Sequence, residues 1–211
     1  MHWRVLSRRS PSILSHETWN NLGISLRRLD QYEEAIAAFD SAIQLKPDYH
    51  QAWSNRGNTF YYMSRYEEAI ACYDQALQYE PKSSLAWSNR AGALSNLGRL
   101  EEAISSYDQV LQIEPNNASS WRYRGFALNS LGLYENAVAS FDKVLELISE
   151  DAQAWSNRGI ALANLRRYEE AIASYERALE YESEDAQAWS NRGLALASSL
   201  RRKFTSAFLG C

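Results

Sequence analysis

The sequence contains few of the residues from which catalytic and metal sites are built. Its 211 residues include only two cysteines, Cys72 and Cys211, which fit neither a zinc site nor a disulfide framework. The three histidines, His2, His16 and His50, share no helix face. A Gly-rich phosphate loop is also absent from the sequence. We therefore expect no metal, no cofactor and no catalytic residue, and we interpret the chain as a protein that is not an enzyme.

Long apolar runs and excess positive charge are also missing. Nowhere do about 18 apolar residues follow one another, which excludes a transmembrane helix. Six of the 22 basic residues lie in residues 1–15 and 199–211, which contain no acid, so residues 16–198 hold 16 basic against 26 acidic residues. Such a body repels nucleic acid. We expect no nucleic-acid partner; RNA binding stays an alternative that salt-sensitive binding to single-stranded RNA would support.

Residues 1–15 form a basic N-terminal tail that does not continue the pattern of the rest of the chain. Their Arg-rich, Ser-rich and acid-free character is weakly similar to an organelle transit peptide, whereas the apolar run is too short for a secretory signal. A disordered tail is the simpler interpretation. The scarcity of cysteine suits a reducing compartment, so the expected location is cytoplasmic, with organelle targeting as the alternative.

One pattern, repeated at a constant step, organises the chain. Tryptophan recurs at Trp19, Trp53, Trp87, Trp121, Trp155 and Trp189. Alanine recurs at Ala35, Ala69, Ala103, Ala137 and Ala171, and an aromatic follows each alanine four residues later, at Phe39, Tyr73, Tyr107, Phe141 and Tyr175. Proline closes the first three units at Pro47, Pro81 and Pro115. A fixed period of this length indicates a solenoid, in which each unit buries its apolar face against its neighbours.

Within one unit the apolar spacing predicts two helices. From Trp53 onward, Gly57 and Phe60 recur at helical spacing, and after a break at residues 64–65 a second face follows. We call these helices A and B. Gly57 and Ala69 are small because two helices of a hairpin approach closely where they cross.

The unit resembles the tetratricopeptide repeat, whose pattern of Trp, small residue, Leu or Phe, Ala, aromatic and Pro it follows. The resemblance covers residues 16–198, as five full 34-residue repeats and the A helix of a sixth. It implies an all-α fold, a right-handed superhelical solenoid of antiparallel helix pairs. It also implies a concave groove, lined by the A helices, that holds an extended peptide or a partner helix.

Two recurrent charged features have simple structural explanations. An acidic pair opens helix B at Glu33 and Glu34, Glu67 and Glu68, Glu101 and Glu102, and Glu169 and Glu170. Negative charge in the first turn favours the helix dipole by about 0.3–1 kcal/mol, so we prefer this role to a catalytic one. Arginine follows the central asparagine at Arg56, Arg90, Arg124, Arg158 and Arg192. We expect these arginines to form ion pairs with the preceding B helix. A buried packing role is expected for Cys72.

The groove positions, carried over by the resemblance, are the second, fifth, sixth, ninth, twelfth and thirteenth of each unit, counting the tryptophan as the fourth. The candidate peptide-binding residues at these positions are Asn21, Asn55, Asn58, Tyr61, Asn89, Tyr123, Phe126, Asn129, Asn157 and Asn191. Asparagine offers both a donor and an acceptor, and a ladder of them could bind the backbone of a peptide. The alternative, hydrogen bonding between neighbouring units or to water, stays open, and both can hold.

Two other properties of this groove follow from its residues. The clamp by which chaperone-binding relatives hold a C-terminal carboxylate needs cations where this chain has Ser54, Ser119 and Tyr123, so such tails are disfavoured. Aromatic rings stand at groove positions instead, and we expect at least two of Tyr61, Tyr62, Tyr123 and Phe126 to be solvent-accessible. In the first unit Arg27 and Arg28 stand there, and an acidic end of a ligand could lie beside them.

Residues 199–211 form a basic and apolar C-terminal tail where the repeat pattern stops. The sixth unit lacks the sequence that should open its helix B, and the segment carries Leu200, Phe204, Phe208 and Leu209. It could be a cap, the edge of a longer protein, or an apolar surface buried against a partner, including self-association through this end. We interpret the chain as a scaffold binding other proteins or peptide segments; the alternative is the repeat portion or a truncated relative of a larger repeat-containing enzyme or regulator.

Overall fold

The computed structural model describes residues 14–209, with side chains up to residue 204. Most of the basic N-terminal segment, and the side chains of Phe208 and Leu209, therefore lie outside the described residues. Within this range the chain contains eleven helices and no strand, as the all-α prediction requires. No helix among the described residues combines the length and the apolar character needed to cross a membrane.

The chain divides into two compact units, Met1–Arg99 and Leu100–Cys211. The helices of the first unit are α2 (His16–Arg28), α3 (Tyr32–Leu45), α4 (His50–Tyr62), α5 (Tyr66–Tyr79) and α6 (Ser84–Asn96). Those of the second are α7 (Leu100–Ile113), α8 (Ala118–Ser130), α9 (Tyr134–Leu147), α10 (Ala152–Asn164), α11 (Tyr168–Tyr181) and α12 (Ala186–Leu209). The even-numbered helices are the predicted A helices and the odd-numbered ones the B helices.

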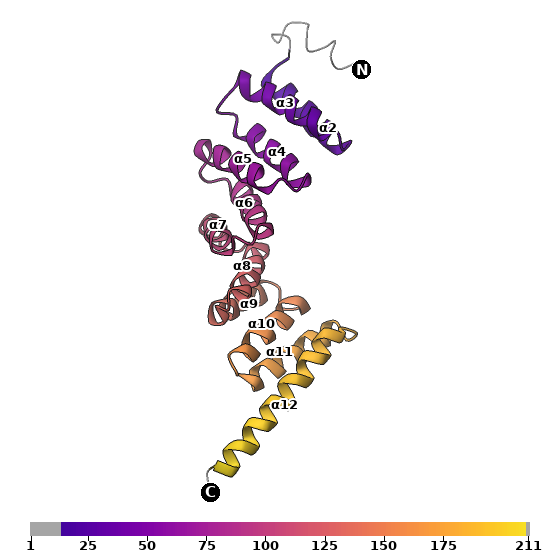
Figure 1. Ribbon diagram of the computed structural model, residues 1–211, viewed down its shortest axis with the longest axis vertical. Coiled ribbons are helices and arrows are strands. Elements are labelled where there is room, and N and C mark those ends of the chain that lie inside the picture. Colours follow the sequence, from indigo (N-terminus) through magenta and orange to yellow (C-terminus); the bar gives the residue numbers. More distant parts are fainter. Residues whose placement is uncertain (1–13, 210–211) are drawn as a thin grey trace. The chain divides into compact units, whose positions relative to one another are not determined.

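Consecutive A and B helices form antiparallel hairpins within each unit (Figure 1). The pairs α2 and α3, α4 and α5, α8 and α9, and α10 and α11 are packed against each other, and each B helix also contacts the A helix that follows it. Neighbouring A helices touch as well, α4 with α2 and α6, and α10 with α8 and α12. The A helices therefore lie side by side in each unit, and their shared face is the predicted site.

A left-handed residue reverses the chain between helix A and helix B. Positive φ occurs at Asp30, Ser64, Gly98, Gly132 and Arg166, which stand at the same position of successive repeats. Glycine adopts this conformation without a steric penalty, whereas for other residues it costs about 1–2 kcal/mol. Tertiary packing of the hairpin offsets that cost at Ser64 and Arg166.

In every A helix except α2, the tryptophan bonds to the loop that precedes the helix. In five of the repeats the indole Nε1 of this tryptophan donates to the carbonyl oxygen six residues earlier, at 2.8–2.9 Å. The acceptors are Pro47, Pro81, Pro115, Ser149 and Ser183. Because this acceptor is a backbone oxygen, the bond is also present before the last two A helices, where serine replaces proline.

In four A helices a missing Cβ allows close approach to the aromatic ring of the B helix that follows. A Cβ built on Gly23, Gly57, Gly125 or Gly159 would lie 2.6–2.8 Å from a ring atom of that aromatic residue. The rings belong to Phe39, Tyr73, Phe141 and Tyr175, which are 0–1% exposed. The close crossing expected from the small residues is therefore present.

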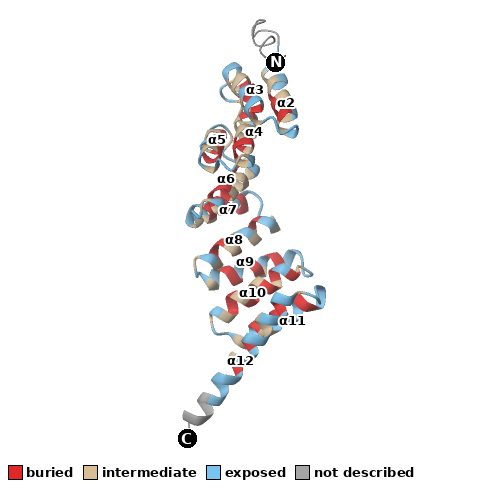
Figure 2. Cartoon of the chain, turned by 45° about the vertical axis from the view of Figure 1, so that its right-hand side comes forward, coloured by how far each residue is buried: buried red, intermediate tan, exposed pale blue. Residues whose placement is uncertain are grey.

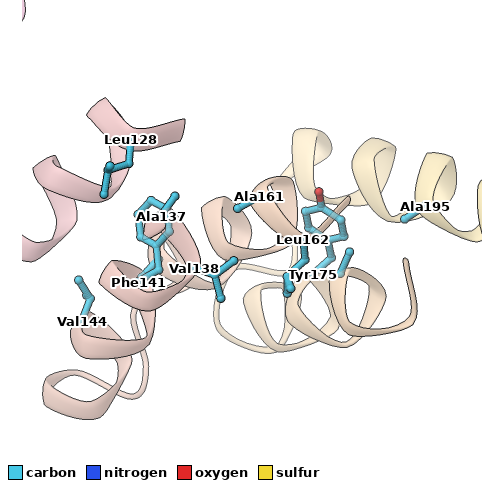
Figure 3. Packing of buried hydrophobic residues seen from close by; sticks show 11 residues of the cluster. Leu128, Ala137, Val138, Phe141, Val144, Ala161, Leu162, Tyr175 and Ala195 are labelled. Carbon is cyan, nitrogen blue, oxygen red and sulfur yellow. The ribbon is translucent and has the colours of Figure 1, made fainter. Parts of the chain in front are cut away.

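The core of the second unit runs through several hairpins without interruption (Figure 3). Buried side chains from α8, α9, α10, α11 and α12 belong to one cluster, whose members include Leu128, Phe141, Leu162, Tyr175 and Ala195. Burying a large apolar side chain contributes about 1.5–3 kcal/mol to the stability of the fold. Each repeat supplies only some of the side chains that surround a buried residue, and neighbouring repeats supply the rest. The first hairpin of the other unit has its own cluster around Phe39.

Helix α12 begins as a normal A helix but continues without interruption to Leu209. The boundary predicted at residues 198 and 199 therefore lies within one helix. Its exposed residues gather toward the C-terminal end, where residues 200–204 are all exposed (Figure 2).

Candidate functional site

A cleft of about 300 Å³ lies between α4 and α6 in the first unit. Seven of its lining residues come from these two A helices, namely Asn58, Tyr61, Tyr62, Leu85, Ser88, Asn89 and Gly92. All seven stand at the groove positions of the repeat, and Tyr73 of α5 completes the lining. The register therefore predicts which side chains share one hollow of the surface.

Hydrogen bonds fix the asparagines of this cleft. The Tyr73 hydroxyl donates to Asn58 Oδ1 at 2.8 Å, and Asn89 Nδ2 donates to the same oxygen at 2.9 Å. Burial raises the pKa of Tyr73, so its hydroxyl keeps the donated proton at neutral pH. An amide oxygen has two lone pairs, and both are used on Asn58. Its Nδ2 hydrogens are the groups it can offer to a ligand, which must then supply an acceptor such as a peptide carbonyl.

Aromatic and cationic groups stand at one end of the same cleft. Tyr61 packs edge-on against Tyr62 with ring centroids 6.4 Å apart, and Asn96 Nδ2 donates to the Tyr61 hydroxyl at 2.9 Å. Tyr62 is 60% exposed, and the guanidinium of Arg27 lies 5.3 Å from its ring centroid. The end nearest α2 therefore joins an accessible ring to a positive charge.

A second cleft, of about 190 Å³, occupies the equivalent place between α10 and α12 of the other unit. It is lined by Ile160, Ala163, Asn164, Tyr175, Asn191, Leu194, Ala195 and Ser198. Burial raises the pKa of Tyr175 to about 12. Asn191 Oδ1 accepts from Gln187 Nε2 at 2.9 Å on the same helix. This cleft has more aliphatic lining and fewer aromatic rings than the first.

Helix α8 presents the other predicted aromatic pair. The Tyr123 ring stacks on Tyr107 with centroids 6.1 Å apart and is 52% exposed, whereas Phe126 packs against the core ring of Phe141. With Tyr62 and Tyr123 both more than half exposed, the expectation that at least two rings are accessible is confirmed. Phe126 is half-buried and serves the core as well.

The asparagine ladder bonds largely within the protein. Asn55 Nδ2 donates to Asn20 Oδ1 at 2.9 Å, which joins α4 to α2 as Asn89 joins α6 to α4. Asn129 Nδ2 donates to the Asn157 carbonyl at 3.3 Å and thereby joins α8 to α10. Asn157 bonds back to its own helix, and Asn21 is exposed on α2. The alternative in which asparagines bond between neighbouring units is thus present, and ligand binding stays a prediction.

The arginines beside the asparagines form the predicted structural ion pairs. Each contacts an acid of the preceding B helix at 2.6–2.8 Å: Arg56 with Asp40, Arg90 with Asp74, Arg124 with Asp108, Arg158 with Asp142, and Arg192 with Glu176. They also lie over their own tryptophan, 5.6–5.9 Å from the ring centroid. The positive charges are therefore already paired in the scaffold.

The remaining charged and reactive candidates also have structural roles. The repeated glutamates lie in the first turns of the B helices, and Arg65 holds the pKa of Glu68 below its usual value through a hydrogen bond of 2.8 Å. Cys72 is buried, and burial raises the pKa of its thiol. Among residues 14–204, no three metal-ligating side chains come together.

Sequence reasoning missed two of the most exposed residues of the clefts. Leu85 and Leu194 are each 66% exposed and line the first and second cleft. Both stand at groove positions, the second and the ninth, so extending the register to every such position would have found them. Aliphatic side chains at groove positions therefore line the clefts beside the predicted asparagine and aromatic residues.

Comparison with known proteins identifies the repeat. Models described as tetratricopeptide repeat match residues 14–79, 54–118, 97–153 and 152–185. No curated protein matches the chain.

Solved structures share the fold at low sequence identity. YrrB, described as a TPR protein with an unusual peptide-binding site, is 19% identical, with a TM-score of 0.78 over 90% of this chain and 97% of YrrB. A tetratricopeptide repeat protein from Parabacteroides merdae ATCC 43184 is 20% identical, with a TM-score of 0.76 over 91% of this chain and 76% of that one. MamA from Desulfovibrio magneticus RS-1 is 17% identical, with a TM-score of 0.73 over 81% and 97%.

Proposed function

The chain belongs to the tetratricopeptide repeat family, and on this premise we propose that it is a non-catalytic binding module that holds an extended peptide segment of another protein. The contact surface is the shared face of the A helices. The observation that carries the proposal is the cleft between α4 and α6, all of whose A-helix lining residues stand at groove positions. The description of YrrB as having a peptide-binding site supports the same use of the fold.

The chemistry of the first cleft favours a peptide over a small charged ligand. Asn58 offers amide hydrogens suited to a backbone carbonyl, while Leu85 and Tyr62 supply exposed apolar area for one side chain. Rigid aromatic contact combined with hydrogen bonding is typical of binding hot spots. The arginines of the repeats are paired with acids, which leaves little positive charge for a phosphate or nucleic acid.

Each unit has its own set of proposed contact residues. They are Asn21, Asn55, Asn58, Tyr61, Tyr62, Leu85 and Asn89 in the first, and Tyr123, Phe126, Asn129, Asn157, Asn191 and Leu194 in the second. Asn58 acts as a donor held in place by the Tyr73 hydroxyl, and Asn89 is held by the bond that it donates to Asn58 Oδ1. Arg27, beside Tyr62, favours an acidic residue at that end of the peptide.

The test compares two matched pairs of substitutions in the first unit. Peptides selected from a random library on the wild-type chain are measured by fluorescence polarisation. Tyr62→Ala with Leu85→Ala should weaken their binding at least tenfold, since both side chains are exposed in the cleft. The control pair Leu45→Ala and Tyr79→Ala removes side chains that are 46% and 44% exposed at the ends of B helices. Equal affinities for both pairs, or a selection that yields no peptide, would contradict the proposal.

A further inference from the structure

Helix α12 has one face that is covered in every other A helix. The eleventh position of the unit is almost completely buried in the first five repeats, at Leu26, Phe60, Leu94, Leu128 and Leu162. In α12 the corresponding Leu196 is 36% exposed. Trp189, the first residue of this face, is also more exposed than its equivalents. It is 52% exposed, whereas the tryptophans of the earlier A helices are all partly buried.

The centre of this face is an unfilled notch. A Cβ on Gly23, Gly57, Gly125 or Gly159 would meet the aromatic ring of helix B within 2.8 Å, but a Cβ on Gly193 would meet no atom within 4 Å. The glycine that admits a ring in other repeats therefore faces open space in α12.

The exposed apolar residues of α12 form a continuous stripe. Trp189, Gly193, Leu196, Leu200 and Phe204 recur at spacings of three and four residues, so they share one side of the helix. Leu200 is 54% and Phe204 is 65% exposed. We call these five residues the open face of α12.

A neighbouring side of α12 is docked against α11, so the open face is not simply part of a loose helix. Ala188 and Ala195 are buried, and α12 packs against α11. The Ser199 hydroxyl bonds to Glu169 Oε1 at 2.8 Å, and Lys203 Nζ lies 3.4 Å from the same oxygen. A helix anchored along one side presents its other side in a fixed conformation, which lowers the entropic cost of binding.

We propose that the open face of α12 binds an amphipathic helix of another protein, seated as a helix B is seated in the earlier repeats. The required partner carries a small residue and, four residues later, an aromatic residue that enters the Gly193 notch. This is the pattern by which Ala35 and Phe39, or Ala171 and Tyr175, cover the same face of their own A helices.

The charge at the end of α12 suits the acidic first turn that the B helices carry. Residues 201–203 are Arg, Arg and Lys, and Glu169 in the first turn of α11 already contacts Ser199 and Lys203. A helix that enters the open face in the orientation of a helix B brings its first turn to this basic segment. Arg202 and Lys203 bond toward the docked side, to the Arg166 carbonyl and to Glu169, so an acidic residue there gains only a longer-range attraction, which strengthens binding slightly at low salt.

The described residues of a second copy of this chain do not supply such a helix. The aromatic residues at this position of the described B helices are all buried: Phe39, Tyr73, Phe141 and Tyr175 are 0–1% exposed, and Tyr107 is 4% exposed. Within residues 186–204 of α12, no small residue is followed four positions later by an aromatic one. No B-like helix among the described residues is free to cover the open face, and the proposed occupant is a B-like helix of a partner protein.

The experiment uses a fluorescent 14-residue peptide with the sequence of α11, residues 168–181, and the full chain. We expect saturable binding by fluorescence polarisation and at least a tenfold loss with Gly193→Leu, which fills the notch and favours the helix. A peptide in which Ala171 and Tyr175 are both replaced by Ser should also lose at least tenfold. Gln187→Ala, an exposed position on the same helix but away from the open face, should leave the affinity within twofold.

Three outcomes would overturn the proposal. The first is no binding of the peptide to the wild-type chain, and the second is equal binding to the Gly193→Leu variant. The third is a dimer in sedimentation that Gly193→Leu abolishes while the peptide fails to bind, which would assign the face to a second copy. Circular dichroism and urea unfolding of each variant establish that the chain is folded. The variant with Tyr62→Ala and Leu85→Ala tests peptide binding to the first cleft. Its result does not affect this test, which concerns the open face of α12.

Discussion

At the scale of single residues, the space beside each A helix decides which positions tolerate change. Gly159 and Gly193 are the same position of the unit, yet a Cβ would lie 2.6 Å from the Tyr175 ring at the first and more than 4 Å from any neighbour at the second. The two glycines are therefore a natural matched pair.

We expect Gly159→Leu to lower the free energy of unfolding by about 1–3 kcal/mol or more, because a larger side chain cannot enter a filled core without displacing Tyr175. Gly193→Leu should change it by less than about 1 kcal/mol, and in the stabilising direction, because leucine favours the helix. Urea unfolding followed by circular dichroism measures both. Similar losses of unfolding free energy in the two variants would show that contact with the ring of helix B does not decide whether a larger side chain is tolerated.

Buried tyrosine hydroxyls give the fold a dependence on alkaline pH. Burial raises the pKa of Tyr175 from 10.0 to about 12, so the folded chain holds this proton more tightly than the unfolded chain. The resulting contribution is complete below pH 10 and is lost as the pH rises from 10 to 12, by about 1.4 kcal/mol per unit.

The stability of Tyr175→Phe should therefore decline less steeply than that of the wild type between pH 10 and 12. At pH 7 the two should agree within about 1 kcal/mol, since phenylalanine already occupies this position at Phe39 and Phe141. Urea titrations at pH 9, 10 and 11 give the two slopes. Parallel slopes would mean that the hydroxyl of Tyr175 titrates alike in both states.

At the scale of helices, the repeated arginines join two consecutive B helices through one A helix. Arg158 Nε contacts Asp142 of α9 at 2.6 Å, and its second nitrogen donates to Ser174 of α11 at 2.7 Å. The side chain is only 20% exposed. A planar, forked guanidinium can make both bonds at once, whereas an ammonium group cannot reproduce this geometry.

Arg158→Lys should thus destabilise the chain by about 1–3 kcal/mol, because it weakens the pair with Asp142 and leaves the buried Ser174 hydroxyl without this donor. The control is Arg167→Lys, whose pair with Glu170 is exposed and should matter by less than about 0.5 kcal/mol. Both are measured from urea midpoints at constant m-value. An equal effect of the two substitutions would contradict the joining role of Arg158.

The sequence predicts the helices better than it predicts the contacts of the groove. The recurrence of Trp, Gly and Ala determines which residues are helical and which face is buried, because packing in every unit repeats the same geometry. The partner of an amide depends on distances between helices, and so the bond from Asn89 to Asn58 was one of two open alternatives. The continuation of α12 to Leu209 was also missed, since the repeat pattern ends earlier than helix-forming residues do.

At the scale of the whole chain, stability is distributed along the sequence. Within each unit, helices contact only their near neighbours in the chain, and the buried cluster of α8–α12 contains no residue from the first unit. In repeat proteins of this kind, stability is a sum of local and nearest-neighbour contributions, and parts of the chain can open separately. A destabilising change should therefore act mostly near its own position.

Hydrogen exchange can measure this directly with Gly159→Leu. We expect amides of α10 and α11 to exchange faster by tenfold or more, because a loss of about 1.4 kcal/mol raises the population of the locally open state tenfold. Amides of α2–α5 in the first unit should keep their protection, while Gly193→Leu should leave all helices close to wild type. A uniform acceleration over all the described helices would mean instead that the chain opens as one cooperative body, and the core of each unit would then depend on the other.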